Sequence, residues 1–163
     1  ISNKGQEKFL RRKVAAFDFS QHNKKEIRDL IKNMRLTMKK ARGIGLSANQ
    51  IGLDLKFFIA QVENKFYAVF NPKIIKVSEE KITLEEGCLS VPEIFGQVER
   101  PAQVILEGQD ASSKKIKVKA WGLLARVFQH EVDHLNGILF VDKGKDFYKI
   151  ENVRIKDHND NVK

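Results

Sequence analysis

Apolar residues recur every three or four positions in two separate stretches of the chain, a spacing that places them on one face of a helix. The first stretch covers residues 24–42, with the apolar positions Ile27, Leu30, Ile31, Met34, Met38 and Ala41. Asn23 and Glu26 form a capping-box pattern at its start, and Gly43 stands where a left-handed residue often ends a helix. The second stretch covers residues 123–136. The pattern therefore predicts two helices.

Between these helices, apolar and polar residues alternate, as they do in half-buried antiparallel strands. The alternation predicts strands at residues 55–61, 65–70, 73–77, 81–85, 102–107 and 115–120. Residues 63–64 and 109–114 are typical of hairpin turns. Residues 43–52 hold three glycines and small side chains, which predict irregular backbone. The expected fold class is α+β, with antiparallel or mixed β-sheets.

The two ends of the chain give weaker patterns. Residues 9–14 fit a short helix or a strand, and the polar tail from Asp142 onward fits a short helix or a frayed end. The sequence contains no internal repeat, low-complexity tract or linker, so residues 1–163 are expected to form one domain. Hydrophobic residues make up 42% of the chain, which is enough for a core and excludes a disordered protein.

The net charge of +9 is confined to the start of the chain. Residues 1–42 hold 13 basic and four acidic side chains, a net charge of +9, whereas residues 43–163 hold 17 of each sign. A domain that reads a nucleic-acid sequence carries a basic stripe through its folded body, and this body is neutral. The charge distribution therefore argues against a specific nucleic-acid partner.

Cys88 is the only cysteine, which excludes an intrachain disulfide and a disulfide-built secreted scaffold. No stretch approaches the ~20 apolar residues that a membrane span requires. Residues 1–5 contain no apolar segment of the kind that signal peptides carry. We expect the reducing cytoplasm of a bacterium, with an organelle as the alternative setting, and no membrane partner.

The segment His130-Glu131-Val132-Asp133-His134 carries the strongest chemical pattern in the sequence. Residues four apart share one face of a helix, so His130 and His134 can bind one metal ion. Glu131 lies beside them and can reach the open coordination position to move a proton. The alternative is a helix with two surface histidines and an acid. The complete motif in a strongly helical stretch favours the metal.

A catalytic metal site needs a third protein ligand and one open position. A metzincin-type protease would have a third histidine beyond Gly137, but Phe140 stands there. A thermolysin-like protease would use a glutamate from a following helix, and Glu151 in the polar tail is the only downstream candidate. Cys88 is the remaining candidate, because a thiolate binds iron or zinc well. The alternative for a lone cysteine is a small buried residue.

Three motifs, taken in order, resemble those of the peptide deformylase family, in its shorter bacterial type. They are Gly43-Ile44-Gly45-Leu46-Ser47-Ala48-Asn49-Gln50, then Glu86-Gly87-Cys88-Leu89-Ser90, then Gln129-His130-Glu131-Val132-Asp133-His134. The family patterns are GxGLAAxQ, EGCLS and HExxH, and the similarity covers residues 10–142. Ser47 departs from the usual alanine, the N-terminal segment lacks the family's Pro-Asp, and residues 143–163 form a shorter, more polar tail than the family's C-terminal helix.

The resemblance implies an enzyme that removes the formyl group from the N-terminal methionine of new polypeptides and releases formate. It also implies sheets packed around the helix with the HExxH motif, and an N-terminal amphipathic helix. One divalent metal ion, generally Fe2+ with Zn2+, Ni2+ or Co2+ able to substitute, would be held by Cys88, His130 and His134. Glu131 would act as general base and acid. The Gln50 side-chain amide and the Leu89 backbone N–H would stabilise the oxyanion.

The resemblance also implies where substrate binds. The methionine side chain and its peptide would contact Ile44, Leu84, Gly87, Leu123 and Val127, and the backbone of Gly45 would pair with the extended chain. Ordinary core packing is the alternative for the apolar members of this set. Arg126 is expected at the rim of the pocket or on the protein surface, and Asp133 either fixes a ligand or is a solvated helix charge. The expected partners are N-formyl-Met nascent peptides, for a monomeric enzyme in weak association with the ribosome.

Two other functions stay open from the sequence. A zinc protease would use His130, Glu131, His134 and an acid such as Glu151. A non-enzymatic basic RNA-binding protein would hold a structural metal and release no formate. The Cys88→Ala substitution separates the two enzymes, because metal loss would support the deformylase, whereas retained metal with peptide cleavage would support the protease.

Overall fold

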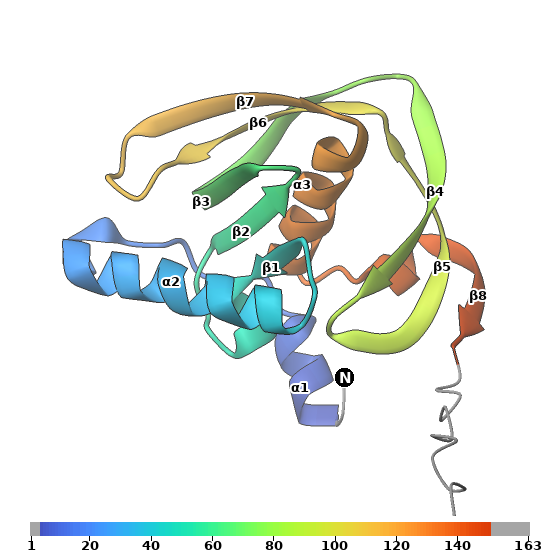
Figure 1. The fold of residues 1–163 in the computed structure, drawn as a ribbon, viewed down its shortest axis with the longest axis horizontal. Helices are drawn as coiled ribbons and strands as arrows, with labels where there is room; N and C mark the ends of the chain where they lie inside the picture. Colours follow the sequence, from blue (N-terminus) through green and yellow to red (C-terminus); the bar gives the residue numbers. More distant parts are fainter. Residues whose placement is uncertain (1–3, 151–163) are drawn as a thin grey trace, which may run out of the picture.

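The computed structural model describes residues 4–150, which form two antiparallel sheets with a helix between them (Figure 1). The first sheet has the strand order β1-β2-β3-β6-β7 and the second the order β4-β5-β8. The first comprises β1 Gly45–Ser47, β2 Phe57–Val62, β3 Lys65–Val77, β6 Gln103–Gln109 and β7 Lys115–Trp121. The second comprises β4 Lys81–Cys88, β5 Val91–Pro101 and β8 Gly144–Lys149. Every strand pair in this range is antiparallel, so the α+β class is confirmed and the sheets are not mixed.

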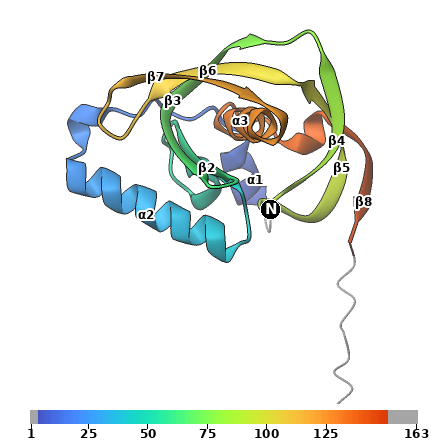
Figure 2. The same ribbon diagram turned by 45° about the horizontal axis from the view of Figure 1, so that its top comes forward.

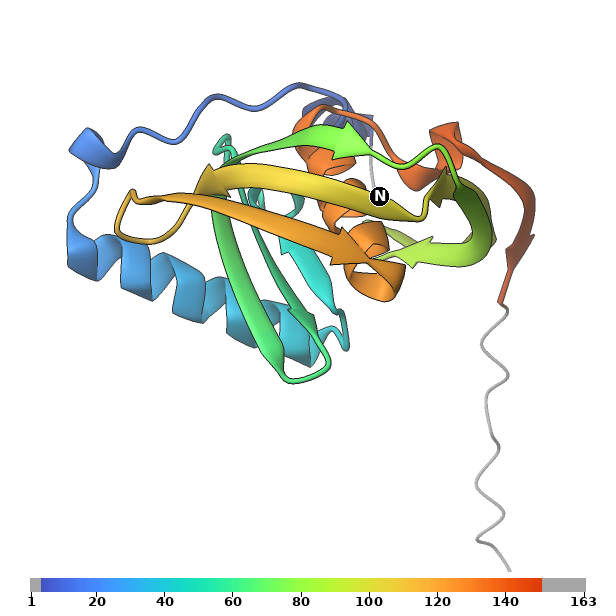
Figure 3. The same cartoon turned by 90° about the horizontal axis from the view of Figure 1, so that it is seen from above.

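Helix α3, Gly122–Leu135, lies between the two sheets and is almost entirely buried beyond its first turn. Figure 2 looks nearly along this helix, with the first sheet on one side and β4 and β5 on the other. The ring of Phe128 packs against Phe58 and Tyr67 of the first sheet, at centroid distances of 5.6 and 5.3 Å. Strands β6 and β7 run across α3 and contact it (Figure 3). This packing fixes the helix against the first sheet.

Helix α2, Lys24–Lys40, covers the opposite face of the first sheet. Its buried residues Met34 and Met38 belong to one core cluster with Phe57 and Ile59 of β2. The other face of β2 packs toward α3, so this strand is buried on both sides. A strand buried on both faces gives a continuous apolar run instead of an alternation.

The predicted ends of α2 are half right. The capping box is confirmed, because the Asn23 side chain accepts from the Glu26 N–H, and the Glu26 carboxylate accepts from the Asn23 N–H at 2.8 Å. The predicted left-handed Gly43 is wrong, since the positive φ of 56° belongs to Arg42. A side chain at position 43 would instead meet Leu89 Cδ1 at 2.7 Å. Gly43 therefore lies close to the Leu89 side chain and does not provide the left-handed end of the helix.

Three further segments differ from the expectation. The N-terminal region holds helix α1, Lys4–Leu10, which overlaps the element expected at residues 9–14 only at residues 9 and 10. The glycine-rich loop contains strand β1 and a 3₁₀ helix, Ala48–Ile51, instead of wholly irregular backbone. The two strands predicted at residues 65–70 and 73–77 are one bent strand, β3, with a register shift between them.

Strands β5 and β8 were not predicted. For β5, the residue types at its buried positions explain why. Its inward positions are Gly96, Val98 and Arg100, so only one of three buried residues is apolar and the period of two is lost. Strand β8 lies in the polar tail and is exposed along its length after Gly144. Its pairing with β5 is a long-range contact that no local pattern encodes. No helix within residues 4–150 is long and apolar enough to cross a membrane.

Candidate metal centre and active site

Three potential metal-binding side chains meet where the end of β4 touches α3. Cys88 is the last residue of β4, and His130 and His134 lie one turn apart on α3. The Cys88 Sγ is 3.1 Å from the His134 Nε2, which is 3.2 Å from the His130 Nε2. Two nitrogens that bind one tetrahedral ion at ~2.1 Å stand ~3.4 Å apart. The three donors, all within 4.8 Å of one another, therefore fit a single ion.

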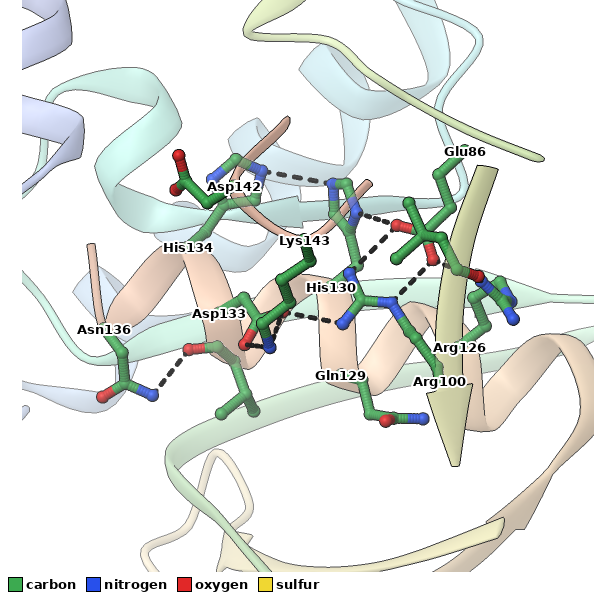
Figure 4. Close-up of polar contacts among 12 residues, drawn as sticks. Glu86, Arg100, Arg126, Gln129, His130, Asp133, His134, Asn136, Asp142 and Lys143 are labelled. Atoms are coloured by element: carbon green, nitrogen blue, oxygen red, sulfur yellow. Dashed lines mark hydrogen bonds and ion pairs between the residues drawn. The ribbon is translucent and has the colours of Figure 1, made fainter. Parts of the chain in front are cut away.

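Glu86 sets the orientation of His130 (Figure 4). Glu86 lies two residues before Cys88 on β4, so both side chains point to the same face of the strand. Its Oε2 is 3.1 Å from the His130 Nδ1, and this contact turns the Nε2 of the ring toward His134. A carboxylate on the second nitrogen is the usual way of fixing a metal-binding histidine.

A buried ionic network holds Glu86 in place. Its Oε1 accepts from the Arg100 Nε at 2.6 Å and from the Arg126 Nη1 at 2.7 Å. The Arg100 Nη1 donates to Asp133 at 2.7 Å, and the Lys143 Nζ donates to the same carboxylate. Figure 4 shows these side chains side by side behind His130. Each buried charge thus has a partner of opposite sign, as low-dielectric surroundings demand.

The pKa values in the cluster follow from burial opposed by close partners. Burial favours neutral Glu86, but the hydrogen bonds from His130 and Arg100 outweigh it and lower its pKa to about 2. Burial disfavours charged His130, but its hydrogen bonds to Cys88 and Glu86 and the Glu131 charge raise its pKa to about 10. Burial and then the charge of His130 lower the pKa of His134. The groups around His130 therefore favour a positive charge at this ring.

Glu131 is buried beside the three donors, with 3% of its surface exposed. A Cβ added to Gly45 would lie 2.3 Å from its Oε1, so only glycine leaves room for the carboxylate there. Its Oε2 has no hydrogen-bond partner among residues 4–150. Burial is the main reason why its pKa is raised, to about 7. A buried carboxylate with one unpartnered oxygen, beside three potential metal ligands, is a candidate for proton transfer.

The Gln50 carboxamide is held at one end and faces the cysteine at the other. Its Oε1 accepts from the Ser47 N–H at 2.8 Å and lies 3.0 Å from the Ser47 Oγ. Its Nε2 lies 3.7 Å from the Cys88 Sγ and 3.1 Å from the Ser90 Oγ. The unusual serine of the first motif is therefore buried at the site and contacts the side chain that closes the motif.

A cavity of about 590 Å³ opens in front of these groups. It brings together most of the predicted site residues, namely Ile44, Gly45, Gln50, Gly87, Cys88, Leu89, Leu123, Val127, His130 and Glu131. His134 lies behind them and is 1% exposed. Leu84 is 47% exposed and lies outside this lining. The cavity therefore has an apolar wall on one side and the polar cluster on the other.

The comparison with protein families decides what this arrangement belongs to. Residues 3–149 match the family model described as polypeptide deformylase. The chain belongs to the polypeptide deformylase family. Its relatives are named peptide deformylase, an enzyme, so the chain is an enzyme of this family.

Relatives and solved structures agree with this assignment. The peptide deformylase of Rhizobium meliloti (strain 1021) is 48% identical over 122 residues, which cover 72% of this chain and 70% of the relative. The peptide deformylase of Treponema pallidum (strain Nichols) is 45% identical over 118 residues, which cover 72% of this chain and 73% of the relative. The structure of a peptide deformylase from Synechococcus elongatus in complex with actinonin matches with a TM-score of 0.79 and 36% sequence identity. The match covers 85% of this chain and 75% of that chain. The structure of the Thermotoga maritima peptide deformylase matches with a TM-score of 0.78 and 36% sequence identity, over 84% of this chain and 91% of that chain.

At two residues the structure decides between the alternatives that the sequence left open. Arg126 lines the cavity but is buried, with 7% exposure, and its Nη2 donates to the Ile82 carbonyl at 2.6 Å. It is therefore not a surface residue. Asp133 is also buried and is not a solvated charge. Its link to His130 runs through Arg100 and Glu86.

Sequence reasoning missed Arg100 and Lys143 as supports of the site. Arg100 lies on β5, opposite Ile82 of β4, and no periodic pattern marked that strand. Position could have suggested Glu86, since it stands two residues before Cys88. The protease alternative requires Glu151, which falls outside the described residues. The geometry instead brings Cys88 to the two histidines.

Proposed function

We propose that the chain is a metal-dependent hydrolase that removes the N-formyl group from the N-terminal methionine of newly made polypeptides and releases formate. The observation that carries the proposal is the convergence of Cys88, His130 and His134 beside Glu131, at the wall of one cavity. The family assignment and the names of the relatives support it. We also propose that one domain comprises the whole of residues 1–163.

Cys88, His130 and His134 would hold one divalent ion. A thiolate with two imidazoles suits iron and zinc, and we propose Fe2+ in the cell, with Zn2+, Ni2+ or Co2+ able to substitute. When bound, the ion supplies Lewis-acid chemistry, polarising a carbonyl oxygen and lowering the pKa of a water to ~7. The chain supports the ion by fixing the His130 ring through Glu86.

Glu131 is the proposed general base and acid. Its Oε2 is buried and unpartnered among the described groups, so it is available to the water that attacks the formyl carbon. It takes the proton of that water and then delivers a proton to the departing amine of methionine. The lack of a side chain on Gly45 keeps the carboxylate at the cavity wall.

Two donors are proposed to stabilise the negative charge on the formyl oxygen. One is the Nε2 of Gln50, whose Oε1 is anchored by Ser47. The other is the backbone N–H of Leu89, next to Cys88 and at the cavity wall. Donors that are held before the reaction cost no reorganisation when charge develops, and one such donor contributes ~3 kcal/mol.

The substrate is proposed to lie in the 590 Å³ cavity. The methionine side chain contacts the apolar wall, for which the proposed residues are Ile44, Gly87, Leu123 and Val127. The expectation that Leu84 belongs to this wall is not kept, because Leu84 lies outside the cavity lining. Within residues 4–150, strand β1 is an edge strand that pairs with β2 on one side, so the backbone at Gly45 can pair with an extended peptide. We further propose a monomer that works in the cytoplasm close to the ribosome, where formylated chains are made; the charge of α2 supports this location.

Formate release from a formyl-Met tripeptide tests the proposal directly. Glu131→Ala, loaded with the same metal as the wild type, should lower kcat by ~10²–10⁴-fold, because proton transfer is lost while binding remains. Glu99→Ala, on the outer face of β5 in a surface ion pair with Lys81, is the control and should keep wild-type kcat. Equal rates in the wild type and in Glu131→Ala would refute the mechanism.

The Cys88→Ala substitution separates this enzyme from a zinc protease. We expect it to lose stoichiometric metal, measured by elemental analysis, together with formate release. Metal retained at one ion per chain, with cleavage of internal peptide bonds, would instead support the protease. Wild-type protein that binds metal and releases no formate would point to a structural metal.

A further inference from the structure

The exposed face of α2 carries a dense set of cations. Eight lie on the helix and the turn after it, namely Lys24, Lys25, Arg28, Lys32, Arg35, Lys39, Lys40 and Arg42. Only Glu26 and Asp29 oppose them on the helix, and Glu26 is engaged by the Asn23 N–H of the capping box. None of the eight takes part in an ion pair within residues 4–150. Their charge is therefore not compensated by ion pairs within residues 4–150.

Four of these cations form a line, which we call the α2 stripe: Arg28, Lys32, Arg35 and Lys39. Their spacing of four, three and four residues places them on one helix face, over ~16 Å at 1.5 Å per residue. They border a shallow groove of about 440 Å³ whose floor includes Ile31, Leu36 and Phe66. The stripe thus combines a row of positive charge with an apolar floor.

Two contacts hold Arg35, one member of the stripe, against the first sheet. The Arg35 guanidinium lies 4.4 Å over the centre of the Phe66 ring. Its Nη2 also donates to the Gln61 Oε1 at 3.1 Å. Leu36 lies beside it and is 58% exposed. A chain with both phosphates and flat apolar groups would satisfy both features.

We propose that the α2 stripe binds the phosphate backbone of single-stranded RNA, without reading its sequence. Phosphates along a strand give the negative charge that these cations lack, and sugar or base faces can contact Leu36 and Phe66. The choice of RNA among polyanions rests on the proposed function, because newly made polypeptides grow on RNA-rich particles. Arg42 and Gly43, just beyond α2, line the active-site cavity, so RNA on the stripe would lie beside the cavity mouth.

A labelled RNA strand tests the stripe by fluorescence anisotropy. The probe is a fluorescein-tagged 20-nucleotide RNA of unstructured sequence, titrated with metal-loaded full-length protein between 50 and 200 mM salt. The variant R28Q/K32Q/K39Q keeps Arg35, which packs on Phe66. Removing three phosphate contacts should weaken binding at least tenfold and make the slope of log K against log salt shallower by ~2.

The matched control is K73Q/K115Q/K119Q, which removes the same charge from exposed positions of β3 and β7. It should keep near wild-type affinity and salt slope. Equal weakening in both triple variants would show that binding follows net charge, and absence of wild-type binding at 50 mM salt would also overturn the proposal. Formate release from a free formyl-Met peptide should be the same in all three proteins. Its absence would count against the proposed function and leave the RNA measurement independent.

Discussion

The charges around Glu86 and the charges of α2 obey opposite rules. Glu86 and Arg100 have 5% and 3% of their side chains exposed, and each meets partners of opposite sign within 3.1 Å. The α2 cations are mostly exposed, and none is ion-paired within the described chain. Water solvates an exposed ammonium, whereas a buried ion without a partner costs several kcal/mol. The buried charges around Glu86 must therefore pair with one another, whereas the exposed α2 cations can bind a partner.

The sharpest test of this contrast removes one cation from each region. Arg100→Met leaves Glu86 and Asp133 buried with part of their compensation gone, so it should lower the free energy of unfolding by ~3–5 kcal/mol. Lys32→Met removes an exposed charge of the α2 stripe and should change it by less than ~0.5 kcal/mol. Urea unfolding at pH 7 measures both. Similar small losses in the two variants would show that the buried network contributes little.

Acid should weaken the buried network around Glu86. The pKa of Glu86 in the folded protein is about 2, below its ordinary value of 4.5, so its stabilisation is complete above pH 4.5. It is lost as the pH falls from 4.5 toward 2, and the loss is on the order of 3 kcal/mol. Urea unfolding of chelated protein between pH 6 and 3 should show this decline. Glu86→Gln has no such carboxyl and should decline less steeply; parallel curves would contradict the assignment.

A smaller effect should follow from weakening the contact between Glu86 and His130. Glu86→Gln keeps the size of the side chain but weakens its hold on the His130 Nδ1. Loss of a carboxylate behind a metal-binding histidine typically lowers metal affinity by ~10–100-fold. Competition with a chromophoric chelator measures the affinity. Glu85→Gln is the matched control, because Glu85 is exposed and its carboxylate accepts from the Tyr148 hydroxyl instead. Equal affinities for the two variants would refute the role of Glu86.

Local patterns predicted the helices and strands whose buried positions are apolar. The α2 capping box is correct because its hydrogen bonds join residues three apart in the sequence. The turn between β2 and β3 is correct for the same reason, with Glu63 at a φ of 54°. Strand β5 escaped because its buried side includes Gly96 and Arg100. An arginine faces inward there only because Glu86 and Asp133 lie across from it.

The candidate site divides along the same line. Helical spacing predicts that His130, Glu131 and His134 lie close together, because residues three or four apart on one helix are neighbours on its surface. Cys88 is 42 residues earlier than His130 and could be joined to it only by exclusion or by resemblance. Arg126 could have been suspected, since it stands four residues before His130 on α3. No pattern indicated Arg100 or Lys143.

By itself, the sequence determined the two main helices, most of the strands, the reactive groups and the location of the excess charge. Each of these depends on residue type and on spacing within about one turn or one hairpin. Only the tertiary structure decided that Cys88 meets the histidines, that Glu86 and Arg100 hold His130, and that the α2 cations form no ion pairs within residues 4–150. These outcomes depend on which residues from distant elements share a buried space, where an unpaired charge is costly and packing fixes the partners.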